Sequence, residues 1–184
     1  MTITIFQKNW AFTSAESEKP QIKTGAFGPC YVVTFTSTGF AAMAHIDDTT
    51  QVESIKAIFD EFLKNSIAVK DIKVVILGGW KSHPESFKWG NKIITQIKDD
   101  GFENISTKNM FKKDQVTIAH QNISISKSLS HHLGALVDAK EGKTYLLKVF
   151  DSEIEQEQFK QMKLFANKYG RDLMDVEIPI SQII

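Results

Sequence analysis

The chain has 184 residues, 42% of them hydrophobic and 24% charged, a composition that indicates one globular domain spanning residues 1–184. Its 22 basic residues balance its 22 acidic ones, so the sequence lacks the basic surface expected of a protein that binds nucleic acid. It holds one cysteine, no run of the ~20 apolar residues needed to cross a bilayer, and no secretory signal pattern. We therefore expect a reduced protein without a membrane partner, located in the cytoplasm of its own cell or delivered to that of a host.

A β-hairpin is the clearest local pattern in the first third of the chain. Residues 2–6 alternate as a short strand does, and residues 13–19 predict an exposed loop. β-Forming residues then run from Cys30 to residue 35, a turn is expected at residues 37–39, and residues 40–44 return to His45. The position opposite Cys30 falls near 45 or 46, which brings the thiol and the imidazole to the same end of the hairpin.

Such a pair suits a cysteine nucleophile activated by a histidine base. Taken singly, each residue has a simpler interpretation. A lone cysteine at the start of a strand is usually a small buried residue, and a lone histidine is usually solvated or hydrogen-bonded.

The remaining pattern alternates helices and strands. A capping box at Thr50-x-x-Glu53 predicts a helix to residue 63, and one at Ser82-x-x-Glu85 predicts a second helix that stops at Gly101. Strands are expected at residues 72–77, 104–107, 116–125, 133–138 and 144–150, and a third helix from Ser152-x-x-Glu155 to Gly170 precedes an apolar tail. The fold class is therefore α+β: a mixed or mostly antiparallel β-sheet sandwich with two helices packed on it, plus a C-terminal helix.

Glycines and histidines elsewhere suggest no cofactor and no metal. Gly78-Gly79 ends a predicted strand, but neither G-x-G-x-x-G nor G-x-x-x-x-G-K-[ST] is present, so we expect these glycines to let the backbone pass close to the site. His83 is expected at the start of a helix, where it would cap the helix or face solvent. His131 and His132 are neighbours on a predicted strand, where their side chains would face opposite ways and would not share one ion.

Three segments resemble the protein N-terminal asparagine amidohydrolase family: CYVVTFTSTGFAAMAHIDDTT, IKVVILGGW and LGALVDAKEGKTYLLKVF. The histidine motif reads His45-Ile46-Asp47-Asp48-Thr49, with Asp48 where that family tends to have glycine. Thr24, the Phe27-Gly28-Pro29-Cys30 segment and His45 are also similar to the motif of chemotaxis receptor glutamine deamidases (CheD), and both families are distantly similar to cytotoxic necrotizing factor. The resemblance covers roughly residues 22–150 and implies a CheD-like deamidase fold.

This resemblance implies hydrolysis of a side-chain carboxamide, of Asn or Gln in a protein or peptide, to a carboxylate and ammonia. Cys30 would be the nucleophile and His45 its base and acid, while Thr24 would orient His45 or meet the substrate. We expect the imidazolium to lower the thiol pKa below its usual ~8.5. Pro29 has no backbone N–H, so the oxyanion needs the N–H of Cys30 and a donor from elsewhere.

Four residues are expected to bind substrate. Asp47 or Asp48 would hold the ammonium of an N-terminal residue, and the glycine backbone would meet the substrate at Gly28 and Gly79. The alternatives are another cysteine hydrolase or acyl transferase, such as a peptidase or transglutaminase-like enzyme, or a non-catalytic binding module on the same scaffold.

Overall fold

The computed structural model describes the chain except for residues 26–29, 80–83, 111–133, 148–179 and 184. Its strands are β1 (Thr2–Ile5), β2 (Asn9–Ser14), β3 (Gln21–Thr24), β4 (Tyr31–Ser37), β5 (Phe40–Ile46), β6 (Lys73–Gly78), β7 (Asn104–Met110), β8 (Gly134–Asp138), β9 (Lys143–Leu147) and β10 (Ser181–Gln182). Its helices are α1 (Lys56–Lys64) and α2 (Pro84–Asp99), with short 3₁₀ helices η1 (Val52–Ile55) and η2 (Val69–Asp71).

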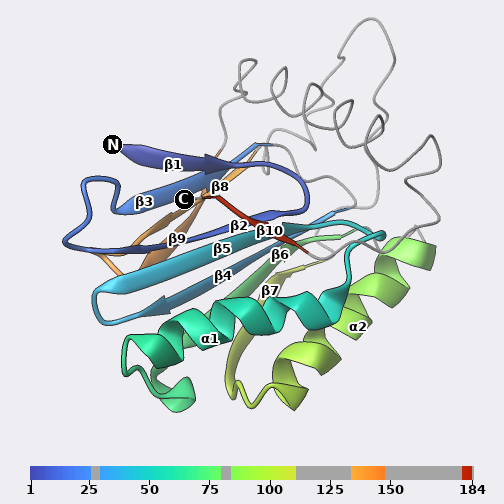
Figure 1. Ribbon diagram of the computed structural model, residues 1–184. Coiled ribbons are helices and arrows are strands. Elements are labelled where there is room, and N and C mark those ends of the chain that lie inside the picture. Colours follow the sequence, from blue (N-terminus) through green and yellow to red (C-terminus); the bar gives the residue numbers. More distant parts are fainter. Residues whose placement is uncertain (26–29, 80–83, 111–133, 148–179, 184) are drawn as a thin grey trace, which may run out of the picture.

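The described strands form two mixed sheets that pack face to face. A four-stranded sheet has the order β1-β3-β8-β9, and a six-stranded sheet has the order β10-β2-β5-β4-β6-β7. Both helices cover the outer face of the six-stranded sheet, which therefore lies in the middle of three layers (Figure 1). The fold class predicted from the sequence, an α+β sandwich of sheets with two helices packed on it, is confirmed.

Each face of the six-stranded sheet is buried by a different partner, because successive side chains of a strand point to opposite faces. Tyr31, Val33 and Phe35 of β4 pack in the layer that also holds Phe62 of α1 and Ile97 of α2. The intervening Val32 packs in the layer between the sheets, with residues of β5, β6, β3 and β8: Ala41, Met43, Leu77, Ile22, Ala135 and Val137. One end of this inter-sheet layer holds the residues of the predicted site.

The β4–β5 hairpin forms where the sequence predicts it, with a tighter turn. Ser37 pairs with Phe40, so the loop has only Thr38 and Gly39, and Gly39 takes the left-handed conformation at φ +76°. In this register Val32 pairs with His45, and Tyr31 pairs with Ile46. The position opposite Cys30 is therefore Asp47, one residue beyond the expected range.

Several other elements agree with the sequence pattern. The strand at 72–77 is β6, an interior strand that ends at Gly78, and the helix stopped by Gly101 is α2, with Gly101 at φ +92°. The strands β1, β7, β8 and β9 and the tail strand β10 also lie where the pattern places them. The strand at 116–125, the third helix, Ser82, His83, His131 and His132 lie outside the described residues.

Three expectations need correction. The strands β2 and β3 were not predicted, and β2 continues through Thr13 and Ser14, where the sequence indicates a loop. The capping box at Thr50 is absent: η1 precedes α1, its N-cap is Gln51, and the Thr50 hydroxyl donates to Asp47 Oδ1 at 2.9 Å. The polar residue that looks like a helix cap is therefore used to hold a neighbouring carboxylate.

Candidate active site

His45 is held by a hydrogen bond that crosses from one sheet to the other. Its Nδ1 lies 2.9 Å from Oγ1 of Thr24, the last residue of β3, and both side chains are fully buried. Its other ring nitrogen, Nε2, is buried and has no hydrogen-bond partner among the described residues. If Nδ1 carries the proton and donates it to Thr24, then Nε2 presents a lone pair that is free to accept a proton.

Gly134 allows the contact that holds Thr24 in place. A Cβ at this position would lie 2.5 Å from the carbonyl oxygen of Thr24, closer than side chains approach a backbone atom. Because β8 pairs with β3 in antiparallel fashion, this glycine lets the two strands run close together at the end nearest His45. Gly134, the first described residue of the late segment LGALVDAKEGKTYLLKVF, thus contributes to the site through its backbone.

Cys30 lies directly before β4, at the same end of the sheet as His45. Its side chain is partly exposed and packs against the inter-sheet layer that contains Val32. Val32 pairs directly with His45, and residues two apart on a strand share a face, so Cys30 and His45 are diagonal neighbours on one face. Such neighbours have Cα atoms about 7–8 Å apart, a separation within reach of an aromatic side chain such as that of His45.

A buried ion pair flanks this end of the sheet. Lys8 Nζ lies 2.9 Å from Asp47 Oδ1, and the exposed fractions of the two side chains are only 7% and 6%. Oδ1 also accepts hydrogen bonds from the Thr49 backbone N–H at 3.0 Å and from the hydroxyls of Thr49 and Thr50. Lys8 Nζ in turn donates to the Thr49 hydroxyl. The carboxylate is therefore locked into the fold.

The sequence did not identify Gln7 as a site residue. It occupies the turn between β1 and β2, and its Nε2 lies 2.7 Å from Asp47 Oδ2 and 3.6 Å from Cys30 Sγ. Nothing in the local pattern distinguishes this glutamine, because both of its partners are distant in sequence. The only signal was indirect: Pro29 offers no N–H, so a donor for the nucleophile's reaction had to come from another segment.

The four residues expected to bind substrate differ in their surroundings. Asp48 is exposed, whereas Asp47 is buried and its two oxygens already accept hydrogen bonds from Lys8, Gln7 and neighbouring threonines. Gly79 donates its backbone N–H to the Cys30 carbonyl at 3.1 Å, which fixes the backbone that carries the thiol. Gly28 lies outside the described residues.

Burial is the largest influence on the protonation of Cys30 and His45. It lowers the pKa of His45 to about 4, against a smaller opposing effect of Asp47. It raises the pKa of the Cys30 thiol, and the negative charges of Asp47 and Asp48 raise that pKa further. The expectation of a lowered thiol pKa is therefore wrong for the resting site, which holds a protonated thiol and a neutral imidazole at pH 7.

Asp47 remains ionised despite its surroundings. Burial alone would raise its pKa, but the charge of Lys8 and the hydrogen bonds from Lys8, Thr50 and Thr49 outweigh that effect and lower it. A fixed negative charge therefore faces this end of the sheet. It favours an imidazolium on His45 once a proton has been transferred there.

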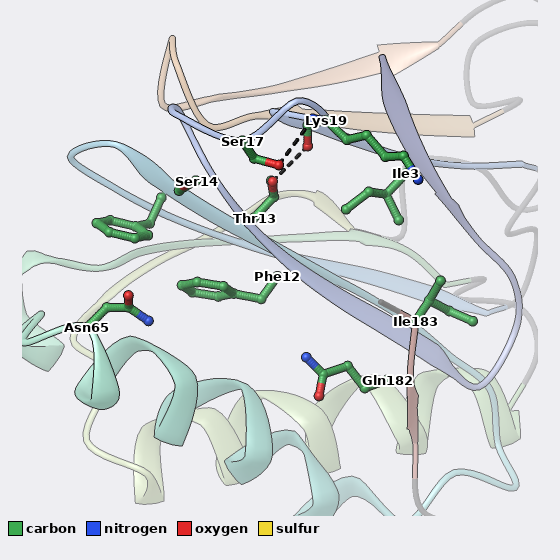
Figure 2. Close-up of a pocket in the computed structure, with 10 residues that line it drawn as sticks. Ile3, Phe12, Thr13, Ser14, Ser17, Lys19, Asn65, Gln182 and Ile183 are labelled. Carbon is green, nitrogen blue, oxygen red and sulfur yellow. Dashed lines mark hydrogen bonds between the residues drawn. The ribbon is translucent and has the colours of Figure 1, made fainter.

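A separate pocket of about 370 Å³ lies toward the turn end of the β4–β5 hairpin (Figure 2). It is lined by Ile3, Phe12, Thr13, Ser14, Ser17, Lys19, Phe40, Asn65, Gln182 and Ile183. Ser14 pairs with Phe40, the first residue of β5, whereas His45 lies near the other end of that strand. Cys30, His45 and Thr24 do not line this pocket.

Among the described residues, no group of three or more His, Cys, Asp or Glu side chains is arranged to hold a metal ion. No helix in the described part of the chain is long and apolar enough to cross a membrane.

Comparison with known proteins identifies a family for nearly the whole chain. The family model described as protein N-terminal asparagine amidohydrolase matches residues 1–177. No curated protein sequence matches the chain. The family match extends beyond the roughly 22–150 segment whose motifs suggested the resemblance, and it includes β1, β2 and the turn that carries Gln7.

Proposed function

Since the chain belongs to the protein N-terminal asparagine amidohydrolase family and is thus a hydrolase of amide bonds, we propose that it deamidates an N-terminal asparagine of a protein or peptide. Cys30 is the nucleophile, His45 is the base and acid, and Thr24 positions His45. The observation that carries this proposal is the state of the His45 ring, whose Nδ1 is bonded to Thr24 while its buried Nε2 has no partner in the described structure. That arrangement prepares one nitrogen to exchange protons.

The reaction begins with a neutral pair. The Cys30 thiol gives its proton to His45 Nε2 as the sulfur attacks the carboxamide carbon, and the carbonyl oxygen becomes an oxyanion. When the C–N bond breaks, His45 returns the proton to the departing nitrogen, which leaves as ammonia. A thioester between the substrate carbonyl and Cys30 remains.

Hydrolysis of this thioester completes the cycle. His45 takes a proton from water as the water oxygen attacks the thioester carbonyl, and the C–S bond then breaks. The proton on His45 passes to the departing sulfur, which restores the Cys30 thiol. The net change consumes one water and converts the carboxamide to a carboxylate and ammonia.

The raised thiol pKa favours this concerted route over a standing thiolate–imidazolium pair. A protonated thiol is a weak nucleophile by itself, so its reactivity depends on a base that acts during the attack. The neutral state of His45 at pH 7 supplies that base. The negative charge of Asp47 then stabilises the imidazolium that forms.

Recognition of an N-terminal residue requires an anion for its α-ammonium, and we assign this role to Asp48. Its carboxylate is exposed, and its charge acts on Cys30, which indicates that it lies near the thiol. Asp47 is less suitable because its oxygens are already engaged inside the fold. In this proposal Asp47 organises the site and Asp48 meets the substrate.

Ammonia release from four peptides tests the proposed reaction. The peptides carry N-terminal Asn, N-acetylated Asn, N-terminal Gln and internal Asn in one sequence context. We expect release from N-terminal Asn alone, and Asp48→Asn should raise KM for that peptide because the ammonium loses its partner. Equal release from the acetylated peptide would contradict the ammonium site. No release from any of them, or an amide-linked product when a primary amine is added, would contradict deamidation.

A further inference from the structure

The turn between β1 and β2 holds a side-chain amide against the candidate nucleophile. Asn9 N–H donates to the Phe6 carbonyl at 2.9 Å, which closes the turn around Gln7 and Lys8. The Lys8 backbone N–H donates to the carbonyl of His45 at 2.8 Å, so the turn is bound directly to β5 beside the candidate base. Lys8 adopts a left-handed conformation, with φ +64°, to make this contact. The position of Gln7 is thus fixed by backbone hydrogen bonds.

The orientation of the Gln7 amide is fixed by its partner. Asp47 stays ionised, and an ionised carboxylate only accepts hydrogen bonds, so the group 2.7 Å from its Oδ2 must be the NH₂ of Gln7. That NH₂ carries two hydrogens. One is directed to Asp47, and the other is available to Cys30 Sγ at 3.6 Å. Lys8, Thr49 and Thr50 hold the carboxylate and thereby hold the amide.

We propose that Gln7 is an oxyanion donor of this enzyme, a role that rests on the proposed function of Cys30. The oxygen that becomes negative is bonded to the carbon that Sγ attacks, so it forms next to the sulfur. The second N–H of Gln7, held at the sulfur, therefore lies beside the place where this oxygen forms. Donors fixed in place before charge develops are the ones that stabilise a transition state most. Pro29, which precedes the nucleophile, has no N–H to contribute.

Asp47 is then a positioning residue for this donor. It receives one N–H of Gln7 and thereby fixes the plane of the amide, which keeps the second N–H directed toward Cys30. This role explains why a carboxylate is buried at this point even though its charge raises the pKa of the Cys30 thiol. The buried pair with Lys8 gives the carboxylate a single, fixed position.

The test compares Gln7→Met and Gln7→Ala with a matched control, Gln21→Ala. Gln21 Nε2 donates to Asp138 Oδ2 at 2.7 Å, so the control loses the same kind of Gln–Asp hydrogen bond on β3 without a thiol involved. Each variant is assayed for ammonia release from an N-terminal Asn peptide, for alkylation of Cys30 by iodoacetamide, and for its thermal unfolding midpoint. Alkylation displaces iodide and forms no oxyanion.

We expect both Gln7 variants to lower kcat by on the order of 10²-fold, with KM little changed, because one oxyanion donor is lost. Alkylation of Cys30 should stay within about threefold of wild type, and Gln21→Ala should keep wild-type kcat. An unchanged kcat in folded Gln7→Met or Gln7→Ala would overturn the inference while the deamidase activity stands. A parallel fall in the rate of alkylation and in kcat would mean that Gln7 acts on the reactivity of the thiol. Loss of folding in both variants would mean that Gln7 is needed for the fold. Either result would overturn the inference. A wild-type protein that releases no ammonia would overturn the proposed function and the inference together.

Discussion

At the scale of single residues, the chemistry depends on a histidine that is neutral because it is buried. An exposed imidazole has a pKa near 6.5, whereas burial lowers the pKa of His45 to about 4. A general base must be unprotonated to act, so the pH range of activity is set by this lowered value. The buried Thr24 hydroxyl, 2.9 Å from Nδ1, holds the ring so that Nε2 is the nitrogen left for proton transfer.

The pH dependence of kcat/KM measures the pKa of His45 in the free enzyme directly. The free enzyme is active when His45 is neutral, which holds above its pKa, and activity is lost as pH falls through that pKa. We therefore expect kcat/KM to stay nearly constant from pH 7 to 5 and to reach half its value near pH 4. An acid limb centred near 6.5 would show that the base is an exposed histidine or that His45 is solvated in solution.

Two replacements of Thr24 distinguish the effect of its hydroxyl from the effect of its side-chain volume. Thr24→Val keeps the shape of the side chain but removes the hydrogen-bond partner of Nδ1, so the ring loses the contact that orients it. We expect kcat to fall by about 10-fold or more, whereas Thr24→Ser, which retains the hydroxyl, should lose much less. Equal losses in the two variants would mean that the methyl group of Thr24 matters and its hydroxyl does not.

At the scale of secondary structure, the hairpin register decides whether Cys30 and His45 can work together. Val32 pairs with His45, which places Cys30 and His45 on one face; a shift of one residue would send His45 to the face that packs on the helices. The sequence predicted the hairpin and both residues, but it expected a three-residue turn at 37–39. The two-residue turn at Thr38-Gly39 sets this register and thereby determines which residues of β4 and β5 share a face.

Other parts of the fold were beyond sequence reasoning for identifiable physical reasons. The segments NWAFTS and QIKT are short and half polar, so β2 and β3 give only a weak alternating pattern. Thr50 has the letters of a helix cap but binds Asp47, a tertiary contact that overrides the local pattern. Gln7 meets its partners only after the β1–β2 turn folds onto β5.

Gly79 directly follows β6, in a position that no other residue fits. A Cβ there would lie 2.3 Å from the buried Tyr31 hydroxyl, and its φ of +79° is unfavourable for any side chain. We expect Gly79→Ala to reduce the free energy of unfolding by about 2–4 kcal/mol. Gly39→Ala is the matched control, since Gly39 has φ +76° but a Cβ there would meet no atom within 4 Å, and the variant should lose only about 1–2 kcal/mol. If urea unfolding shows the same loss of free energy of unfolding in both variants, the clash with Tyr31 is excluded as the cause.

At the scale of the whole molecule, the site lies where the two sheets meet. Thr24 comes from the four-stranded sheet and His45 from the six-stranded sheet, and the inter-sheet layer beneath them is apolar. Packing that stabilises the sandwich therefore also excludes water from His45. A single domain over residues 1–184 stays a prediction, because long segments of the second half of the chain lie outside the described residues.

Burial of His45 couples global stability to pH. Between about pH 6.5 and 4 the unfolded chain binds a proton at this residue and the folded chain does not, so the free energy of unfolding falls as pH decreases. The loss is on the order of 3 kcal/mol by this linkage. His45→Gln should remove that part of the slope in urea unfolding between pH 7 and 4.5. An unaltered slope in the variant would mean that His45 is protonated in the folded protein.

Asp47 also makes the free energy of unfolding fall as the pH decreases, but in a lower pH range than His45. Its folded pKa is lowered, so its contribution to stability is present above the unfolded value near 3.8 and is lost as pH falls through the folded pKa. Both groups lie at the catalytic end of the sandwich, and both lower the free energy of unfolding as the pH falls. Acid should therefore disturb the site through these buried groups.

The rate at which Cys30→Ala releases ammonia from a peptide with N-terminal Asn tests the central claim most directly. Cys30 precedes β4 and is partly exposed, so its replacement removes little core volume and should leave the thermal unfolding midpoint nearly unchanged. We predict that the folded variant releases no ammonia above the peptide-only control, while the wild type turns over. Ammonia release by folded Cys30→Ala at the wild-type rate would contradict a cysteine nucleophile and with it the mechanism proposed for this site.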